Sequence, residues 1–334
     1  MAGVRDVAAA AHVSVATVSR YLNGKLVLPP DTAARIDAAR ASLNYRANPH
    51  AQRLSRGRSD TLGLVIPEIA NPFFAALADT IQREAEAEGL EVLIAATRNR
   101  TDRELAALDR LGRQGTDGVV FVTNHADDGT LARALQAIPH AVLLDEDVAG
   151  TTMPKLFADN VEGGRLAASH LLAHGHRRVA ILGGPAGVFS AEERHRGFRD
   201  GIAAGGGQVV FADHGDYTVE AGRRGADVML GLASRPTAVF ATSDQTALGV
   251  LDAARIRGVA VPEALSLIGF DDIGPWHLLN PALTAIRQPV EELGRRAVQL
   301  LLASIAGHVA GGPERLPVEL VVRASVAPPR ERGF

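Results

Sequence analysis

Short apolar runs and longer amphipathic stretches alternate along most of this chain, and this alternation restricts the possible folds more than any other feature. The apolar runs, of three to five residues each, lie at 62–66, 92–95, 118–122, 141–144, 179–182, 209–211, 238–240 and 265–268. Apolar strands joined by helical crossovers predict parallel sheets covered by helices on both faces. The pattern restarts after Asp159 and Asn160, so we expect an α/β body of two lobes.

The bulk composition indicates a globular protein of more than one domain. The 334 residues exceed the length of one ordinary core, and 46% hydrophobic with 22% charged residues is a normal globular balance. The absence of cysteine excludes disulfides and thiolate metal sites. The N-terminus lacks a signal-peptide profile, and no uncharged apolar run approaches the roughly 18 residues that a membrane span needs. We therefore expect a soluble, cytoplasmic protein.

The first 47 residues carry three short helical patterns. Apolar residues between Val4 and Ala11 fall on one face of a first helix. After a tight turn, Ser14 is a suitable N-cap for a second helix over 15–22, and Pro30 begins a third. A helix, a short turn and a second helix form the all-α unit that places its second helix in the major groove of DNA.

The second helix of this unit carries the residues that we expect to read DNA. Val15, Ala16 and Arg20 are the outward candidates, and Arg20 can donate two hydrogen bonds to a guanine edge. Three polar residues beside them are placed to hold phosphates or cap the helix: Ser14, Thr17 and Ser19. A plain three-helix bundle with an exposed arginine is the alternative interpretation.

Charge is distributed unevenly along the chain. Residues 1–60 hold nine basic and four acidic residues, a balance of +5, whereas the remainder holds 26 basic and 34 acidic residues, a balance of −8. A basic end on an acidic body is typical of a nucleic-acid-binding head. An ordinary solvated surface would explain the same numbers.

Polar and aromatic side chains follow several of the predicted strands. Ligands bind beyond the carboxyl ends of the strands in open α/β sheets, and the residues at those ends are Phe73, Phe74, Asp145, Ser243, Asp244 and Asp271. Carboxylates that accept from hydroxyls and aromatic faces that stack on C–H surfaces suit a polyhydroxylated ligand. Taken alone, the two phenylalanines would equally serve as core residues.

Several motifs of the head together resemble one known family. The segments VRDVA at 4–8, VSVATVSR at 13–20, LNG at 22–24 and NYRANP at 44–49 resemble the DNA-binding head of LacI/GalR repressors almost residue for residue. One departure is His12, where the family usually has a glycine. If that position needs a left-handed backbone, histidine tolerates it at a small cost in stability.

The segment that follows resembles the hinge helix of the same family. The resemblance implies that Leu54 enters the minor groove and that Asn23 and Ala51 also contact DNA. A flexible linker that becomes helical only on DNA fits the segment as well. The predicted organisation is a helix-turn-helix head at 1–47, a hinge at 48–59 and an effector-binding, dimerising body at 60–334.

The body resembles the periplasmic sugar-binding-protein fold that LacI/GalR repressors use as their sensor. The resemblance implies that Phe73 and Phe74 form an aromatic sugar clamp, and it implies further ligand contacts by Asp145, Arg194, Tyr217, Ser243, Asp244, Asp271 and Gln288. It also implies a homodimer, whose two heads meet a palindromic operator in double-stranded DNA.

Two departures from the family bear on the ligand. Glu146 stands where the family often has arginine, and Ser243 stands where it often has asparagine. An added acid near the cleft disfavours a phosphorylated ligand, and the segments 143–148 and 155–157 are most like ribose-type repressors. The expected effector is therefore a sugar such as ribose.

Two other classes of function fit parts of the sequence. A sugar-binding transport protein would explain the body but not the first 58 residues. An α/β enzyme acting on a sugar would use the cleft acids, but no nucleophile–base pair stands out. His170 and His174 lie one helical turn apart without an evident third metal ligand. We therefore expect a DNA-binding transcriptional regulator, not an enzyme, without cofactor or metal.

Overall fold

The computed structural model describes residues 2–22, 26–45, 58–308 and 311–330. The chain divides into two compact units, Met1–Ser59 and Asp60–Phe334, which we call the head and the body and describe separately. Three predicted DNA contacts, Asn23, Ala51 and Leu54, lie outside the described residues. No helix in the described ranges combines the length and the apolar character that crossing a membrane requires.

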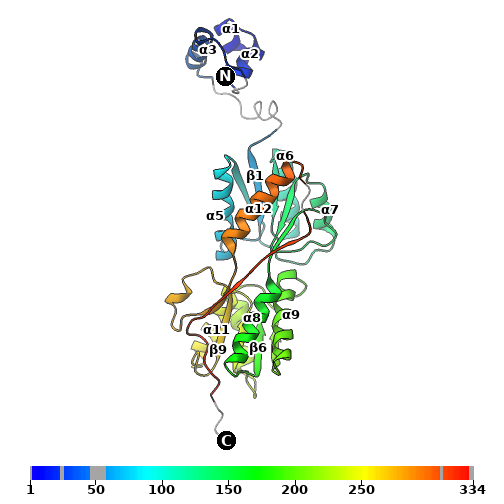
Figure 1. The fold of residues 1–334 in the computed structure, drawn as a ribbon, viewed down its shortest axis with the longest axis vertical. Coiled ribbons are helices and arrows are strands. Elements are labelled where there is room, and N and C mark those ends of the chain that lie inside the picture. Colours follow the sequence, from blue (N-terminus) through cyan, green and yellow to red (C-terminus); the bar gives the residue numbers. More distant parts are fainter. Residues whose placement is uncertain (1, 23–25, 46–57, 309–310, 331–334) are drawn as a thin grey trace. The chain divides into compact units, whose positions relative to one another are not determined.

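In its described residues, the head contains three helices around a small core, as the sequence predicts (Figure 1). They are α1 (Val4–Ala11), α2 (Val15–Leu22) and α3 (Pro30–Ser42). The buried residues of the head core are Val7, Ala8, Ala11, Val18, Ile36 and Ala39. The apolar residues of α1 therefore face inward, as their 3.6-residue periodicity requires.

The body consists of two lobes, each built on a six-stranded sheet, which confirms the predicted α/β architecture. The first sheet has the order β11-β5-β4-β3-β1-β2, and every neighbouring pair in it is parallel. Its strands are β1 (Thr61–Ile66), β2 (Glu91–Ala96), β3 (Gly118–Phe121), β4 (Ala141–Leu144), β5 (Lys155–Ala158) and β11 (Glu314–Leu316).

The second sheet has the order β12-β10-β9-β8-β6-β7 and is parallel except at its edge, where β12 runs antiparallel to β10. Its strands are β6 (Arg178–Leu182), β7 (Gln208–Asp213), β8 (Ala238–Ala241), β9 (Ser266–Asp271), β10 (Thr284–Arg287) and β12 (Glu319–Val321). Strands β1, β3, β4, β8 and β9 are buried at every residue, which explains their continuous apolar sequence.

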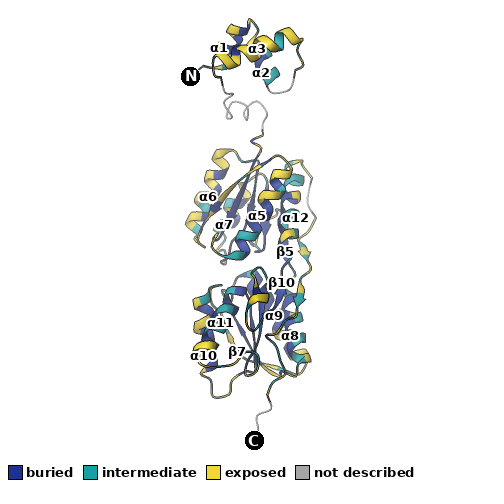
Figure 2. Ribbon diagram, turned by 90° about the vertical axis from the view of Figure 1, so that its left-hand side faces the viewer, coloured by how far each residue is buried: buried dark blue, intermediate teal, exposed yellow. Residues whose placement is uncertain are grey.

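Helices cover both faces of each sheet, and their exposed sides face outward (Figure 2). In the first lobe, α5 (Pro72–Ala87) and α12 (Val290–Ile305) pack on one face, and α6 (Thr101–Gln114) and α7 (Thr130–Gln136) on the other. In the second lobe, α8 (Asn160–Ala173) and α9 (Phe189–Ala204) cover one face. The opposite face is covered by α10 (Val219–Leu230) and α11 (Asp244–Ile256).

The chain passes between the lobes more than once. It leaves the first lobe after β5, returns after β10 to form α12, and leaves it again after β11. The first lobe therefore also includes residues 290–316, which follow the second run of alternating strands and helices in the sequence. Because these crossings lie side by side, they form the connection about which the two lobes can move.

Candidate functional site

The turn between α1 and α2 has the geometry that the sequence suggests. His12 has φ 53° and ψ 47°, a left-handed conformation, which confirms the expectation for this position. Ser14 then caps α2, because its Oγ accepts a hydrogen bond from the Thr17 amide at 3.0 Å. The Ser14 and Thr17 hydroxyls also lie 2.8 Å apart.

One face of α2 is free in the head. Val15, Ala16 and Arg20 are exposed, whereas Val18 on the opposite face is completely buried. The two other predicted contacts, Thr17 and Ser19, are half-buried at the edge of that face. Tyr21 Oη donates to Asp37 Oδ2 at 2.9 Å and so ties α2 to α3. The helix therefore presents a small apolar patch and one guanidinium to the outside.

A small cavity lies between the two lobes of the body. Eight of the nine predicted ligand contacts line it, and the full lining is Asn71, Phe73, Phe74, Asn124, Asp145, Ser190, Arg194, Tyr217, Ser243, Asp271 and Gln288. The first five belong to the first lobe and the others to the second. Most of them follow the carboxyl end of a strand, which is where open parallel sheets place their ligands.

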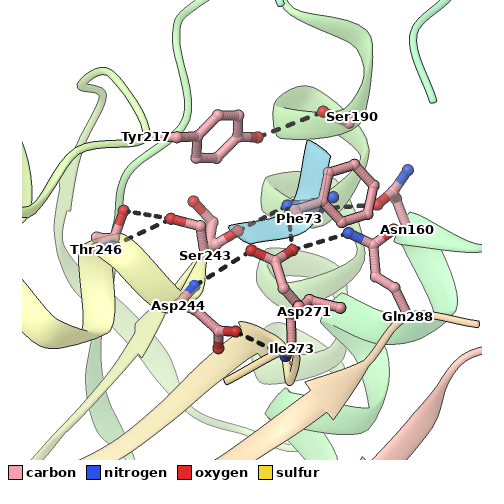
Figure 3. A network of polar contacts seen from close by, with 12 residues as sticks. Phe73, Asn160, Ser190, Tyr217, Ser243, Asp244, Thr246, Asp271, Ile273 and Gln288 are labelled. Carbon is pink, nitrogen blue, oxygen red and sulfur yellow. Dashed lines mark hydrogen bonds and ion pairs between the residues drawn. The ribbon is translucent and has the colours of Figure 1, made fainter. Parts of the chain in front are cut away.

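The aromatic side of the cavity begins at the N-terminus of α5. Asn71 caps this helix by accepting from the Phe73 amide at 3.0 Å. Phe73 and Phe74 are buried, and their rings meet edge to face with centroids 5.3 Å apart. Tyr217 of the second lobe adds a third aromatic ring, and its hydroxyl lies 3.4 Å from Ser190 Oγ (Figure 3).

Arg194 reaches the cavity from α9 and is already held in place. Its Nε donates to Asn160 Oδ1 at 2.8 Å, and its Nη1 donates to the Thr242 carbonyl at 2.8 Å. The guanidinium lies 3.8 Å above the centre of the Phe270 ring, a cation–π contact. A buried cation that is fixed in this way orients a ligand without a change of rotamer.

The carboxylate of Asp271 is held in place by two hydrogen bonds. Its Oδ1 accepts from Gln288 Nε2 at 2.8 Å, and its Oδ2 accepts from the Asp244 amide at 3.3 Å (Figure 3). Burial raises the pKa of Asp271 to about 6, although the nearby Arg194 opposes this rise. The carboxyl is therefore mostly ionised at neutral pH and can accept a further hydrogen bond.

Two buried acceptor atoms at the cavity have no partner in the protein. They are Asp145 Oδ1 and Gln288 Oε1, and leaving such atoms unpaired costs about 1–3 kcal/mol each. Burial raises the pKa of Asp145. Asp145 and Asp271 also have positive φ angles, of 70° and 98°, and strain of this kind concentrates at ligand sites. Hydrogen-bond donors on a bound molecule would satisfy both atoms.

The ninth predicted contact, Asp244, does not face the cavity. Its Oδ2 accepts from the Ile273 amide at 3.0 Å and from Trp276 Nε1 at 2.6 Å. Asp244 therefore fixes the loop after β9, and only its amide reaches Asp271. Ser243 does line the cavity, while its Oγ caps α11 by accepting from the Thr246 amide at 3.1 Å.

Sequence reasoning missed three residues that build the site. Asn124 follows β3, so the rule that finds ligands beyond strand ends could have found it. Ser190 lies four residues before Arg194 on α9, and helical spacing places the two on one face. Asn160 carries no signal of its own, because its role is to hold Arg194.

Two family models match the chain. The model described as bacterial regulatory proteins, lacI family, matches residues 4–48, and the periplasmic binding protein-like domain matches residues 168–326. Over 327 residues the chain is 32% identical to the HTH-type transcriptional repressor CytR of Escherichia coli (strain K12), covering 97% of this chain and 96% of that protein. This chain belongs to the lacI family of bacterial regulatory proteins.

Other members of the lacI family support the same assignment. The ribose operon repressor of Halalkalibacterium halodurans is 33% identical over 326 residues, which are 97% of this chain and 96% of that protein. The crystal structure of the lac repressor dimer bound to operator and the anti-inducer ONPF matches with a TM-score of 0.87 at 29% identity, covering 98% of this chain and 99% of that one. Membership of the lacI family places this protein among DNA-binding transcriptional regulators, not among enzymes.

Proposed function

We propose that this protein is a transcriptional repressor that binds a palindromic operator through its head and senses a sugar in the cavity of its body. The observation that carries the proposal is the cavity itself. Its unpaired acceptors, Asp145 Oδ1 and Gln288 Oε1, are buried in a chain that also carries an exposed DNA-reading helix face. A ligand that supplies the missing donors links the occupancy of the cavity to the arrangement of the lobes.

The chemistry of the lining supports a sugar. Hydroxyl groups can donate to the two unpaired acceptors and accept from Arg194. The rings of Phe73 and Tyr217 can cover the C–H faces of a pyranose or furanose. Eleven of the described residues line the cavity, a small set that favours a monosaccharide over a larger sugar.

Ribose is the first candidate effector. The weak likeness of segments 143–148 and 155–157 to ribose-type repressors supports it, as does the family relationship to a ribose operon repressor. Asp145 and Asp271 face a cavity in which Arg194 is the one cationic residue of the described lining, and two of its five N–H donors are bound to the protein. The excess of acidic over basic lining residues favours an uncharged sugar over a phosphorylated one.

A titration calorimeter tests the effector proposal directly. The full-length protein is titrated with ribose, then with other pentoses, hexoses and ribose 5-phosphate. We expect one uncharged monosaccharide to bind at micromolar strength and the phosphate ester to bind much more weakly. Preferential binding of the phosphate ester would contradict this reading of the cavity. Repeating the titration with operator DNA present gives the sign of the coupling between the two ligands.

DNA binding is tested with the residue most able to read a base. The operator is first selected from random duplexes, and its affinity is then measured by fluorescence anisotropy. We expect Arg20→Ala to weaken binding by about tenfold or more and to relax the preference at one base pair of each half-site. The matched control is Arg110→Ala on exposed α6 of the body. Equal affinities of the two variants would argue against α2 as the reading helix.

We also propose that the protein is a homodimer that pairs through an apolar groove of the second lobe. The groove is lined by Leu248, Leu251, Asp252, Ala254, Arg255, Val259, Val261, Leu279, Asn280 and Pro281. Ile256 and Leu278, which adjoin lining residues in the sequence, are 59% and 74% exposed, and contiguous exposed apolar surface marks protein–protein interaction sites. A second copy of the chain would cover these residues and give a palindromic operator two heads.

Light scattering after size-exclusion chromatography tests the dimer. Leu251→Arg places a charge in the groove and should convert the protein to a monomer at micromolar concentration. Val228→Arg is the matched control, because Val228 is 61% exposed on α10 of the same lobe but does not line the groove. A Leu251→Arg variant that stays dimeric would move the interface elsewhere.

A further inference from the structure

Glu146 reaches from the first lobe to the second. It follows Asp145 at the end of β4, where its amide donates to the Leu144 carbonyl at 2.9 Å. This bond, between residues two apart, and the φ of 70° at Asp145 define a tight, strained γ-turn. The turn directs the Glu146 carboxyl to α9. There the Ser190 amide donates to Oε2 at 3.1 Å, and the Ser190 hydroxyl donates to Oε1.

Helix α9 needs this partner at its N-terminus. Its N-cap residue is Val188, which makes no side-chain capping bond, so its side chain leaves the first-turn amides uncapped. Glu146 supplies an acceptor from the other lobe. The helix also carries Ser190 and Arg194, two residues that line the cavity. The position of Glu146 is therefore linked to the position of both.

The contact between Glu146 and Ser190 depends on the arrangement of the lobes. The two residues are 4% and 1% exposed, so water does not compete for the bonds while the lobes are together. If the lobes separate, both partners are solvated and the bonds are lost. Glu146 itself does not line the cavity. It can therefore affect a ligand through Ser190 and α9 without contacting the ligand.

We propose that Glu146 is a positioning residue that latches α9 to the first lobe and holds the lobes in the arrangement that closes the cavity. The latch sets the affinity for an effector without touching it. The statement about affinity rests on the effector function proposed above, whereas the statement about lobe closure does not.

The charges around Glu146 give the latch a pH dependence. Burial and the adjacent Asp145 raise the pKa of Glu146 to about 8, against the opposing influence of Ser190 and Arg194; the Tyr217 hydroxyl completes the surroundings. In open lobes the carboxyl is solvated and its pKa is that of an ordinary glutamate. Closure therefore favours the protonated acid, and alkaline pH weakens the closed arrangement as the pH rises through 8.

The absence of cysteine from the chain permits a direct test. Arg110→Cys on α6 and Arg224→Cys on α10 introduce one cysteine on each lobe. Dyes attached to these two cysteines report the distance between the lobes by fluorescence energy transfer. In full-length protein, Glu146→Ala should shift the dye-to-dye distance away from the wild-type value at pH 7. Glu146→Gln is the matched control, because its amide can accept from the Ser190 amide and donate to the Ser190 hydroxyl. Glu146→Gln should keep the wild-type dye-to-dye distance at pH 7. In this variant the distance should stay unchanged up to pH 9, whereas the lobes of the wild type should open at that pH.

Ser190→Ala serves as the second variant in case Glu146→Ala folds poorly. It should shift the distance in the same direction, and combining the two substitutions should add little, because both break one contact. Unchanged distances in Ser190→Ala and in a folded Glu146→Ala would overturn the latch. So would a Glu146→Gln variant that opens with pH as the wild type does.

Ribose titration separates the latch from the effector proposal. If ribose binds, Glu146→Ala should weaken it by about tenfold or more, while Glu146→Gln retains the wild-type affinity at pH 7. If ribose binds to no variant but the distances shift as expected, the latch stands and the choice of ribose is wrong. If the distances shift while ribose affinity stays equal in all variants, the control of affinity by Glu146 is refuted.

Discussion

Arg194 and Asp271 lie 3.8 Å apart, from Nη1 to Oδ1, yet each has other hydrogen-bond partners. Arg194 donates to Asn160 and to the Thr242 carbonyl, and Asp271 accepts from Gln288 and from the Asp244 amide. The pair therefore forms a fixed electrostatic wall of the cavity, with acceptor capacity left on Asp271. This arrangement leads to the first two predictions.

Asp271→Asn should weaken effector binding while the fold is retained. The substitution preserves the shape of the side chain but removes the charge that faces Arg194 and the ligand. A hydrogen bond to a charged group contributes about 1.5–3 kcal/mol, so we expect a loss in affinity of roughly tenfold to a hundredfold by calorimetry. The control is Glu220→Gln on the exposed side of α10. Equal affinities in both variants would remove Asp271 from the site.

In Glu146→Gln protein, in which the latch no longer titrates, effector affinity should fall on acidification. The ionised Asp271 carboxylate is the acceptor, and its pKa is raised to about 6, so the acceptor is lost as the pH falls through 6. About one tenth of it remains ionised at pH 5, which predicts an affinity roughly tenfold lower than at pH 7. Asp271→Asn should abolish this fall in affinity between pH 7 and pH 5. A profile in which affinity rises between pH 7 and 5 would contradict the assignment.

Local patterns in the sequence predicted most of the architecture. The three head helices and eight strands, β1 to β4 and β6 to β9, follow from apolar periodicity and short apolar runs. Strand β5, which begins at Lys155, was not predicted. Helix α12 and strand β11 could not be assigned to the first lobe in this way. Their place depends on packing against α5 and pairing with β5, which are distant in sequence.

The residues of the site that follow the carboxyl ends of strands could be predicted from the sequence. Asp145, Ser243 and Asp271 were found because parallel sheets place their carboxyl ends together. Asp244 was expected in the cavity, but the first residue of a helix can turn its side chain back into a loop, as this one does toward Trp276. Ser190 could have been found from its helical spacing to Arg194, but the role of Glu146 depends on lobe closure, for which a single chain segment carries no signal.

The left-handed backbone at His12 predicts a stabilising substitution. A side chain with a β-carbon costs roughly 1–2 kcal/mol at such a position, partly offset by the greater entropy of glycine in the unfolded chain. His12→Gly should therefore stabilise the head by about 0.5–1 kcal/mol, seen as a higher midpoint of its thermal unfolding by circular dichroism. His12→Ala separates the backbone effect from loss of the imidazole, and it should not stabilise. A lower midpoint in His12→Gly would show that the imidazole itself supports the turn.

Ser14 allows the stability of α2 to be separated from its contact with DNA. Because Ser14 Oγ accepts from the Thr17 amide, Ser14→Ala should cost about 1 kcal/mol of head stability and weaken operator binding. Ser14→Asp keeps the cap, so the head should unfold near the wild-type temperature. Its added negative charge beside the DNA backbone should nevertheless weaken operator binding, most strongly at low salt. Thermal unfolding and anisotropy over a series of salt concentrations measure the two effects. If Ser14→Asp binds the operator as well as the wild type at low salt, Ser14 lies away from the phosphates, and α2 approaches DNA through Val15, Ala16 and Arg20 alone.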